Sequence, residues 1–188
     1  MHIIFPILLL IISVFHVNCC YFEKLKSRYA SKLFLMPLLL LCYLDITSNT
    51  DETSMSKRSM LMINAILFGF QGDALLIIQN KKCFLMGLFS FLIGHLLYIM
   101  TIIKRIETFE PIETFMFPLC VLSLLFICVY VKVYMKGLKE EMVYCGLIYG
   151  QTLIVMSVLS LFLAITYKQF EYVLLTCGTF LFCISDGI

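Results

Sequence analysis

The sequence predicts an all-α membrane protein, a polytopic bundle of about seven transmembrane helices. Of its 188 residues, 62% are hydrophobic and only 14% are charged, whereas soluble domains are about half apolar and about a quarter charged. The mean hydropathy is +1.01, and the apolar residues form runs separated by short charged stretches. This composition excludes a disordered chain, and a net charge of +2 spread along the sequence argues against nucleic-acid binding.

Seven apolar runs follow one another along the chain, and a helix built on each can cross a hydrocarbon core of about 30 Å. None shows the alternation of apolar and polar residues that is typical of a membrane β-barrel. The second run is the shortest. The predicted spans are 3–20, 33–44 with a few residues added by Ser31 and Ile46, 60–79, 83–103, 114–134, 143–167 and 171 to the end of the chain.

The first run has two interpretations, a retained helix and a cleaved signal peptide. No basic residue precedes its apolar stretch, and Val17-Asn18-Cys19 lacks the small-x-small pattern of a cleavage site. A retained helix is therefore favoured. No Gly/Ser-rich linker and no internal repeat interrupts the chain, so residues 1–188 are predicted to form a single membrane domain.

Lysine and arginine residues in the loops predict the orientation, because cytoplasmic loops carry the larger number of them. One side holds nine, namely Lys24, Lys26, Arg28, Lys32, Lys81, Lys82, Lys132, Lys136 and Lys139. The other side holds five, namely Lys57, Arg58, Lys104, Arg105 and Lys168. The first group is therefore placed in the cytosol, and the N-terminus on the opposite side.

The nine cysteines are interpreted as structural. Their odd number excludes a full disulfide framework, and no C-x-x-C pair is present. Most lie inside apolar runs, so buried thiols that act as small hydrophobic groups are the favoured interpretation.

Of the twelve acidic residues, ten lie in loops or at helix ends, whereas Asp73 and Asp186 lie inside apolar spans, and His95 lies inside a third span. An ionised aspartate at a helix centre costs about 2.5–3.5 kcal/mol on the insertion scale. Membrane acids of this kind usually face the bundle interior or a wet cavity and have a function. Asp73 and Asp186 are therefore the first candidates for a site.

Helix geometry predicts the depth of each candidate. At 1.5 Å per residue, Asp73, Asp186 and Tyr149 share one layer about 9 Å inside the cytosolic boundary, and His95 lies roughly 9 Å deeper. Three lysines are expected at the mouth on the same side, namely Lys32, Lys81 and Lys82. Two carboxyl groups and a phenol are thus predicted to meet above an imidazole.

Each candidate also has a purely structural interpretation. The two acids can join helices by hydrogen bonds, which in membranes contribute about 0.6 kcal/mol on average. His95 taken alone is more often a packed core group, and Tyr149 taken alone would be core. Small residues on the third and fourth runs are explained by close helix packing, namely Gly69, Gly72, Gly87, Ser90 and Gly94.

Four ordered motifs resemble those of the YhhN family, the lysoplasmalogenases. Residues 67–76, LFGFQGDALL, resemble its L-F-S-x-x-G-D-x-x-L motif, and residues 84–98 resemble F-x-x-G-x-x-x-F-x-x-G-H-x-x-Y. Tyr149 and Met156 match its Y-x6-M pair, and residues 178–186 resemble G-A-x-x-F-x-x-S-D. Near the start, Ser31-Lys32 with Pro37-Leu38 is a looser match to a K-P-L element.

The sequence also departs from the family pattern. Gly69 stands for the serine of the first motif, Thr179 for the usual alanine, and Leu33 for the proline after the lysine. Family members carry an eighth helix after the S-D motif, whereas this sequence stops two residues past Asp186. The resemblance therefore implies a chain that lacks a final C-terminal helix.

The resemblance implies hydrolysis of the vinyl-ether bond of lysoplasmalogens to a fatty aldehyde and glycerophosphoethanolamine or glycerophosphocholine. Asp73 and Asp186 would form the catalytic pair, one protonated and one ionised, as in the two-carboxylate glycosidases. His95 and Tyr149 would orient the pair or the water, Tyr98 and Ser185 would line the pocket, and Lys32 would meet the phosphate. The expected location is the endoplasmic reticulum membrane. No cofactor is expected and no metal, because one histidine with two distant aspartates is a poor zinc set.

Two other functions remain as alternatives. One is a non-enzymatic carrier or channel in which Asp73, His95 and Asp186 relay ions or protons. The other is a structural membrane subunit whose acids only fix helix contacts. A carrier requires a polar route across the whole membrane, and the outer half of the spans offers little beyond Thr101 and Thr166.

Overall fold

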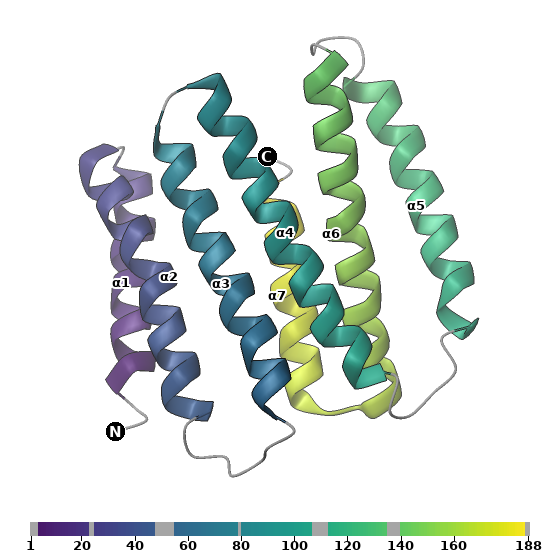
Figure 1. The fold of residues 1–188 in the computed structure, drawn as a ribbon, viewed down its shortest axis with the longest axis horizontal. Helices are drawn as coiled ribbons and strands as arrows, with labels where there is room; N and C mark the ends of the chain where they lie inside the picture. Colours follow the sequence, from purple (N-terminus) through teal and green to yellow (C-terminus); the bar gives the residue numbers. More distant parts are fainter. Residues whose placement is uncertain are drawn as a thin grey trace. The chain divides into compact units, whose positions relative to one another are not determined.

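A computed structural model describes residues 4–22, 25–47, 55–78, 80–106, 113–134 and 140–186. Over these ranges the chain forms α-helices and no strand, which confirms the predicted fold class (Figure 1). The helices are α1 (Ile4–Tyr21), α2 (Leu25–Thr47), α3 (Met55–Ile77), α4 (Lys81–Ile106), α5 (Glu113–Tyr134), α6 (Glu140–Tyr167) and α7 (Phe170–Asp186).

Five of these helices are long and apolar enough to cross a membrane. They are α1, α2, α3, α4 and α6. The apolar parts of α5 and α7 in the described residues are shorter, Cys120–Val129 and Phe170–Ile184. The chain is therefore a polytopic membrane protein by the length and composition of its helices.

Helix α2 is longer than the apolar run from which it was predicted. It begins at Leu25 rather than near residue 31, and α3 likewise begins at Met55 rather than Met60. Lysine and arginine are good helix formers, and their aliphatic stems lie along apolar surface while the charge reaches water. An apolar run thus marks the part of a helix inside the hydrocarbon, whereas the helix itself continues into the interface.

The chain divides into two compact units, Met1–Leu97 and Tyr98–Ile188. Helix α4 contributes its first part to one unit and its last part to the other. The single membrane domain predicted from the sequence stays a prediction.

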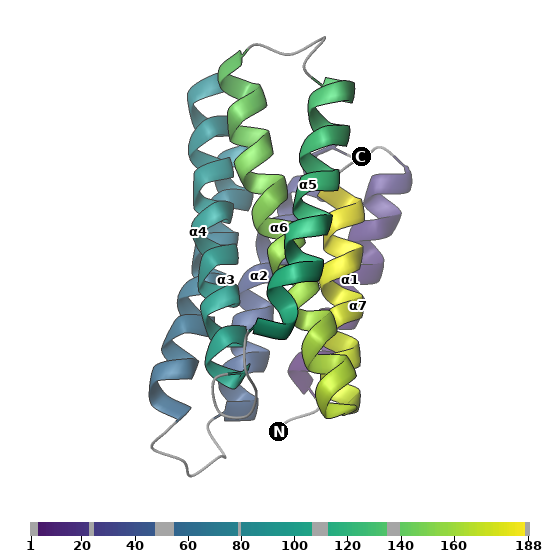
Figure 2. The same ribbon diagram turned by 90° about the vertical axis from the view of Figure 1, so that its right-hand side faces the viewer.

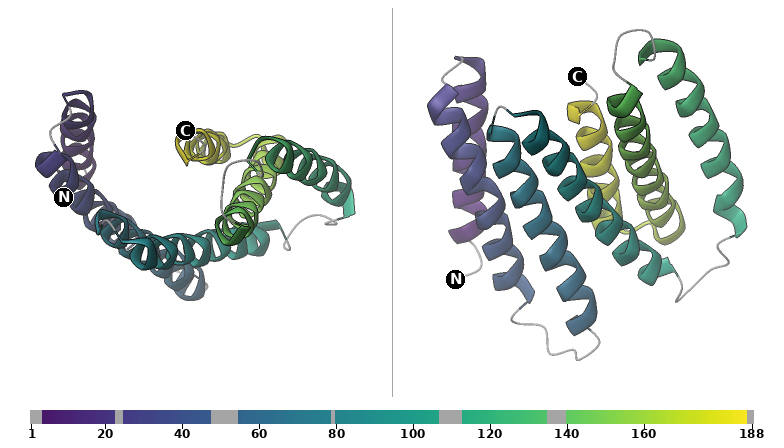
Figure 3. Two further views of the ribbon diagram at one scale, coloured as in Figure 1. Left: turned by 90° about the horizontal axis from the view of Figure 1, so that it is seen from above. Right: turned by 45° about the horizontal axis from the view of Figure 1, so that its top comes forward.

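In the first unit α1 packs against α2, and α2 packs against α3. Successive helices run in opposite directions and lie side by side (Figures 1 and 3). The described side chains join these helices at two levels. Gly69 of α3 contacts Met36 of α2, and Lys32 of α2 reaches Asp73 of α3.

Helices α3 and α4 approach closely through glycines. A Cβ atom at Gly94 would lie 3.2 Å from the backbone oxygen of Ala65, and one at Gly87 would lie 3.2 Å from that of Gly72. Small residues allow such backbone approach between membrane helices. The packing expected from the stripe of small residues is therefore confirmed. The face of α3 that packs against α4 includes Gly72, which directly precedes Asp73.

Replacing Gly72 with alanine is expected to destabilise the first unit by about 1–3 kcal/mol, since overpacking displaces neighbours. The new Cβ would lie 2.7 Å from ring atoms of Phe91, so the ring would have to move. Gly178→Ala is the matched control, because nothing lies within 4 Å of the Cβ position there. It is expected to be neutral or stabilising by up to about 1 kcal/mol, because alanine is the better helix former. Thermal unfolding in detergent compares the two variants, and equal shifts would contradict the packing argument.

The second unit contains α5, α6 and α7, with α6 packed against both of the others (Figure 2). Small polar side chains join α6 to α7. The hydroxyl oxygens of Ser160 and Thr179 lie 2.9 Å apart, and Ser157 Oγ lies 3.2 Å from Cys183 Sγ. Ser157, Ser160 and Thr179 also donate to carbonyls of their own helices. Local bonding of this kind explains why buried hydroxyls are tolerated in an apolar helix pair.

The tight turn between α6 and α7 has a left-handed residue. Lys168 has a φ of 52°, and its amide donates to the carbonyl of Ala164. This is the single-residue cap with which helices commonly end, here made by a lysine in place of the usual glycine.

All nine cysteines are free. Their burial differs from the expectation. Cys19 and Cys42 are buried, whereas Cys20, Cys120, Cys128 and Cys177 are exposed on the helices. An exposed position on a membrane helix faces either lipid or the interface, so the interpretation as buried thiols applies to part of the set.

Candidate active site

Asp73 is a buried carboxyl group about one turn before the end of α3. Its side chain is 8% exposed, and the Nζ atom of Lys32 on α2 lies 2.9 Å from its Oδ1 atom. The lysine side chain is 38% exposed, so it reaches the acid from the more open side. The sequence predicts both residues as part of the site, Asp73 in the catalytic pair and Lys32 at the phosphate, but it does not predict a contact between them.

The register between α2 and α3 explains this contact. Met36 follows Lys32 by one helical turn, and Gly69 precedes Asp73 by one turn. The two helices run in opposite directions, so the contact of Gly69 with Met36 places Asp73 opposite Lys32. The extension of α2 back to Leu25 is also required, because Lys32 would otherwise lie at a helix end.

The ion pair changes how Asp73 is stabilised. The sequence predicts that Asp73 and Asp186 form a pair with one protonated and one ionised carboxyl group, which the described side chains do not test. The structure places an ammonium group on Asp73, and a charge-assisted hydrogen bond of this length stabilises a carboxylate in an apolar environment. A lysine thus offsets the insertion cost of this acid.

His16 of α1 is a polar residue near this pair that the sequence analysis missed. Its Nδ1 atom lies 2.8 Å from Ser31 Oγ on α2, and Ser31 directly precedes Lys32 in the sequence. His16 could have been identified from the sequence, because it interrupts an apolar run as His95 does. The first run was interpreted only as a retained helix or a signal peptide, and neither interpretation considers a polar residue within it.

His95 lies in the first unit on α4 and is 4% exposed. Its Nδ1 atom donates a hydrogen bond to the carbonyl of Phe91 at 2.6 Å. Because a carbonyl only accepts, this bond assigns the proton of a neutral ring to Nδ1 and the lone pair to Nε2. His95 is therefore a buried imidazole whose orientation is fixed by its own helix.

The remaining predicted site residues belong to the second unit. Tyr98 on α4 is half-buried, and Tyr149 on α6 is buried. Ser185 and Asp186 belong to the last turn of α7, and their side chains lie outside the described residues. The meeting of Asp73 with Asp186 in one chamber therefore stays a prediction.

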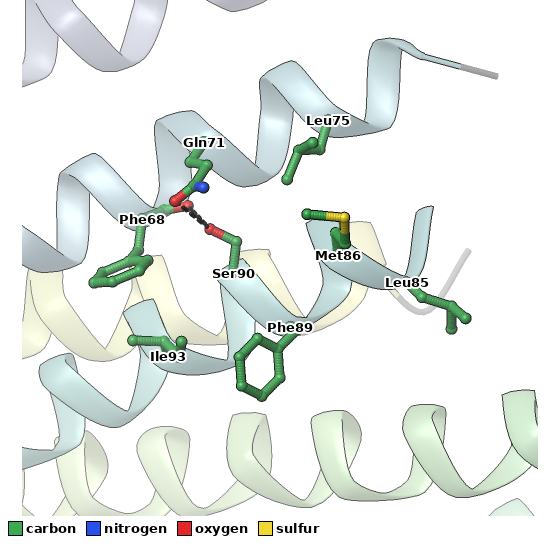
Figure 4. Close-up of a pocket in the computed structure, with 8 residues that line it drawn as sticks. All are labelled: Phe68, Gln71, Leu75, Leu85, Met86, Phe89, Ser90 and Ile93. Carbon is green, nitrogen blue, oxygen red and sulfur yellow. Dashed lines mark hydrogen bonds between the residues drawn. The ribbon is translucent and has the colours of Figure 1, made fainter. Parts of the chain in front are cut away.

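A cavity of about 380 Å³ opens between α3 and α4 in the first unit (Figure 4). It is mostly apolar, and Ser90 Oγ donates to the carbonyl of Phe68 at 2.7 Å at its edge. Gln71 and Leu75 line it from α3, two residues before and after Asp73. Residues two apart on a helix do not share a face, so the cavity lies on the opposite side of α3 from the acid. This cavity is therefore not a substrate site for Asp73.

Comparison with known proteins identifies one family. The family model described as the YhhN family matches residues 27–188, which leaves all of α1, with His16, outside the match. No curated protein and no solved structure matches the chain.

Proposed function

The chain belongs to the YhhN family, and from this premise we propose that it hydrolyses the vinyl-ether bond of lysoplasmalogens. The products are a fatty aldehyde and glycerophosphoethanolamine or glycerophosphocholine. The observation that carries the proposal is the ion pair of Lys32 with Asp73, a charged carboxylate kept in an apolar membrane segment. The membrane of the endoplasmic reticulum is the proposed location, as the family resemblance implies.

The reaction needs an acid and a stabilising anion. A proton is added to the carbon of the double bond that is remote from the ether oxygen, which produces an oxocarbenium ion. Water then adds to this cation and loses a proton, and the resulting hemiacetal separates into aldehyde and alcohol. The transition state resembles that of glycoside hydrolysis, for which enzymes use two carboxyl groups.

The ion pair suggests how the two roles are divided. An ammonium group at 2.9 Å favours the ionised form of Asp73, so Asp73 suits the anion that stabilises the cation and accepts a proton from water. Asp186 would then be the acid that delivers the first proton. His95 and Tyr149 would orient the pair or the water, and Tyr98 and Ser185 would line the substrate site. The Lys32 ammonium carries three donors, which is enough for Asp73 and a substrate phosphate together.

Deuterium incorporation tests the proposal directly. Membranes that contain the protein are supplied with a lysoplasmalogen in D₂O, and the released aldehyde is analysed by mass spectrometry. Addition of a proton to carbon predicts aldehyde that carries one deuterium on the carbon next to the carbonyl.

Two controls accompany this measurement. The saturated alkyl-ether analogue has the same head group and chain length but no double bond to protonate, so it is expected to release no aldehyde. Membranes that lack the protein provide the background. Aldehyde release at background level from the vinyl ether would reject the hydrolase and leave the carrier or structural alternatives.

A further inference from the structure

Three side chains of α1 and α2 form a hydrogen-bonded series that the proposed hydrolysis does not use. Cys20 and His16 lie one turn apart on α1, and Cys20 Sγ lies 3.6 Å from His16 Nε2. The other ring nitrogen, Nδ1, lies 2.8 Å from Ser31 Oγ on α2. A thiol, an imidazole and a hydroxyl are thus connected in the order nucleophile, base and orienting group.

The bonds of Ser31 determine the proton positions in this series. Its hydroxyl donates to the carbonyls of Ser27 and Arg28, at 2.8 Å and 3.1 Å. Because its single proton is directed at carbonyls, Ser31 Oγ accepts from the His16 Nδ1–H group. In the neutral ring the lone pair is then on Nε2, which is the atom that faces the thiol. Cys20 can therefore transfer its proton to His16.

The surroundings of Cys20 indicate what kind of electrophile it would meet. Cys20 is exposed and lies next to the end of α1, followed by Tyr21 and Phe22, which are 81% and 63% exposed. Val17, one turn earlier, is also exposed. Aromatic residues at a helix end mark the membrane interface, where an acyl chain enters the bilayer while its polar end stays in water.

From this geometry we propose that Cys20 accepts a long-chain acyl group from an acyl thioester, with His16 as the base. The Cys20 sulfur forms a bond to the acyl carbonyl carbon as its proton passes to His16 Nε2. The bond between that carbon and the donor sulfur breaks, and the donor leaves as a thiol with the proton from His16. The product is a thioester at Cys20 whose chain extends into the lipid, as in other cysteines acylated next to a membrane helix.

Incubation of the purified full-length chain with palmitoyl coenzyme A tests the proposal. Acylated cysteines are identified by peptide mass mapping before and after treatment with neutral hydroxylamine, which cleaves thioesters. We expect Cys20 to be acylated well before its neighbour Cys19, which is 4% exposed. Equal acylation of the two cysteines, or acylation mainly elsewhere, would overturn the proposal. Because this comparison uses the unmodified protein, it does not depend on how any variant folds.

A substitution at His16 tests the role of the base. In His16→Gln an amide N–H group can still bond Ser31, but no group accepts the thiol proton, so the acylation rate is expected to fall about a hundredfold. Cys177→Ser, an exposed thiol of α7, is the matched control and is expected to leave the rate unchanged. Added imidazole should partly restore the rate in His16→Ala. A wild-type rate in His16→Gln would show that His16 does not activate the thiol.

Discussion

Replacing Asp73 with asparagine is expected to lower aldehyde release by about a hundredfold or more, the range typical for loss of a general acid or base. Asparagine keeps the size of the side chain but carries no charge and accepts no proton from water. The fold should tolerate the change, because the Lys32 side chain is 38% exposed and its charge can reach water. The initial rate of aldehyde release, divided by the amount of folded protein, measures the effect.

Asp45→Asn is the matched control for this substitution. Asp45 lies near the opposite end of α2 from Lys32 and is partly buried, so it is also an acid within an apolar helix. It is expected to keep the wild-type rate. Asp186→Asn should reproduce the loss caused by Asp73→Asn, because the proposed reaction needs both carboxyl groups. A wild-type rate in Asp73→Asn would remove this residue from the mechanism, and a wild-type rate in Asp186→Asn would remove the pair.

The helices could be predicted from the sequence because the hydrocarbon core of a membrane requires both apolar side chains and a helical backbone. Backbone groups in hydrocarbon must bond within the segment, so each run of sufficient length becomes a helix. The ends could not be predicted in the same way. Lys26, Arg28 and Lys32 are charged, so they terminate an apolar run, and yet they continue α2 back to Leu25. Helix ends depend on local propensity and on the interface, which hydropathy does not describe.

The candidate acid could also be predicted, since a charge inside a span is expensive wherever it occurs. The contact of this acid with Lys32 could not be predicted. Asp73 meets Lys32 because Gly69 packs on Met36, and such a register depends on side-chain shape between two helices. Composition and spacing along one helix contain no information about that match. His16 was missed for a related reason, because its importance depends on Ser31 of a different helix.

Removing the lysine is expected to affect stability more than removing the acid. In Lys32→Met the Asp73 carboxylate stays 8% exposed and loses the ammonium group at 2.9 Å. Breaking a fully buried pair typically costs about 3–5 kcal/mol, and breaking an exposed pair costs about 1 kcal/mol or less. With the lysine partly exposed, we expect a loss of about 2 kcal/mol, between these limits. The thermal unfolding midpoint in detergent should fall accordingly, and Lys32→Arg, which keeps the charge, should retain most of the stability.

The double variant separates the charge from the packing. When Lys32→Met is combined with Asp73→Asn, no carboxylate that has lost its ammonium neighbour is left, so most of the lost stability should return while aldehyde release stays low. A large coupling free energy between the two substitutions is the signature of a direct ion pair. Simple addition of the two single effects would mean that Lys32 acts on stability through its packing, and the role proposed for its charge would then fail. Recovery of stability in the double variant would instead show that the lysine charge stabilises the fold through the Asp73 carboxylate.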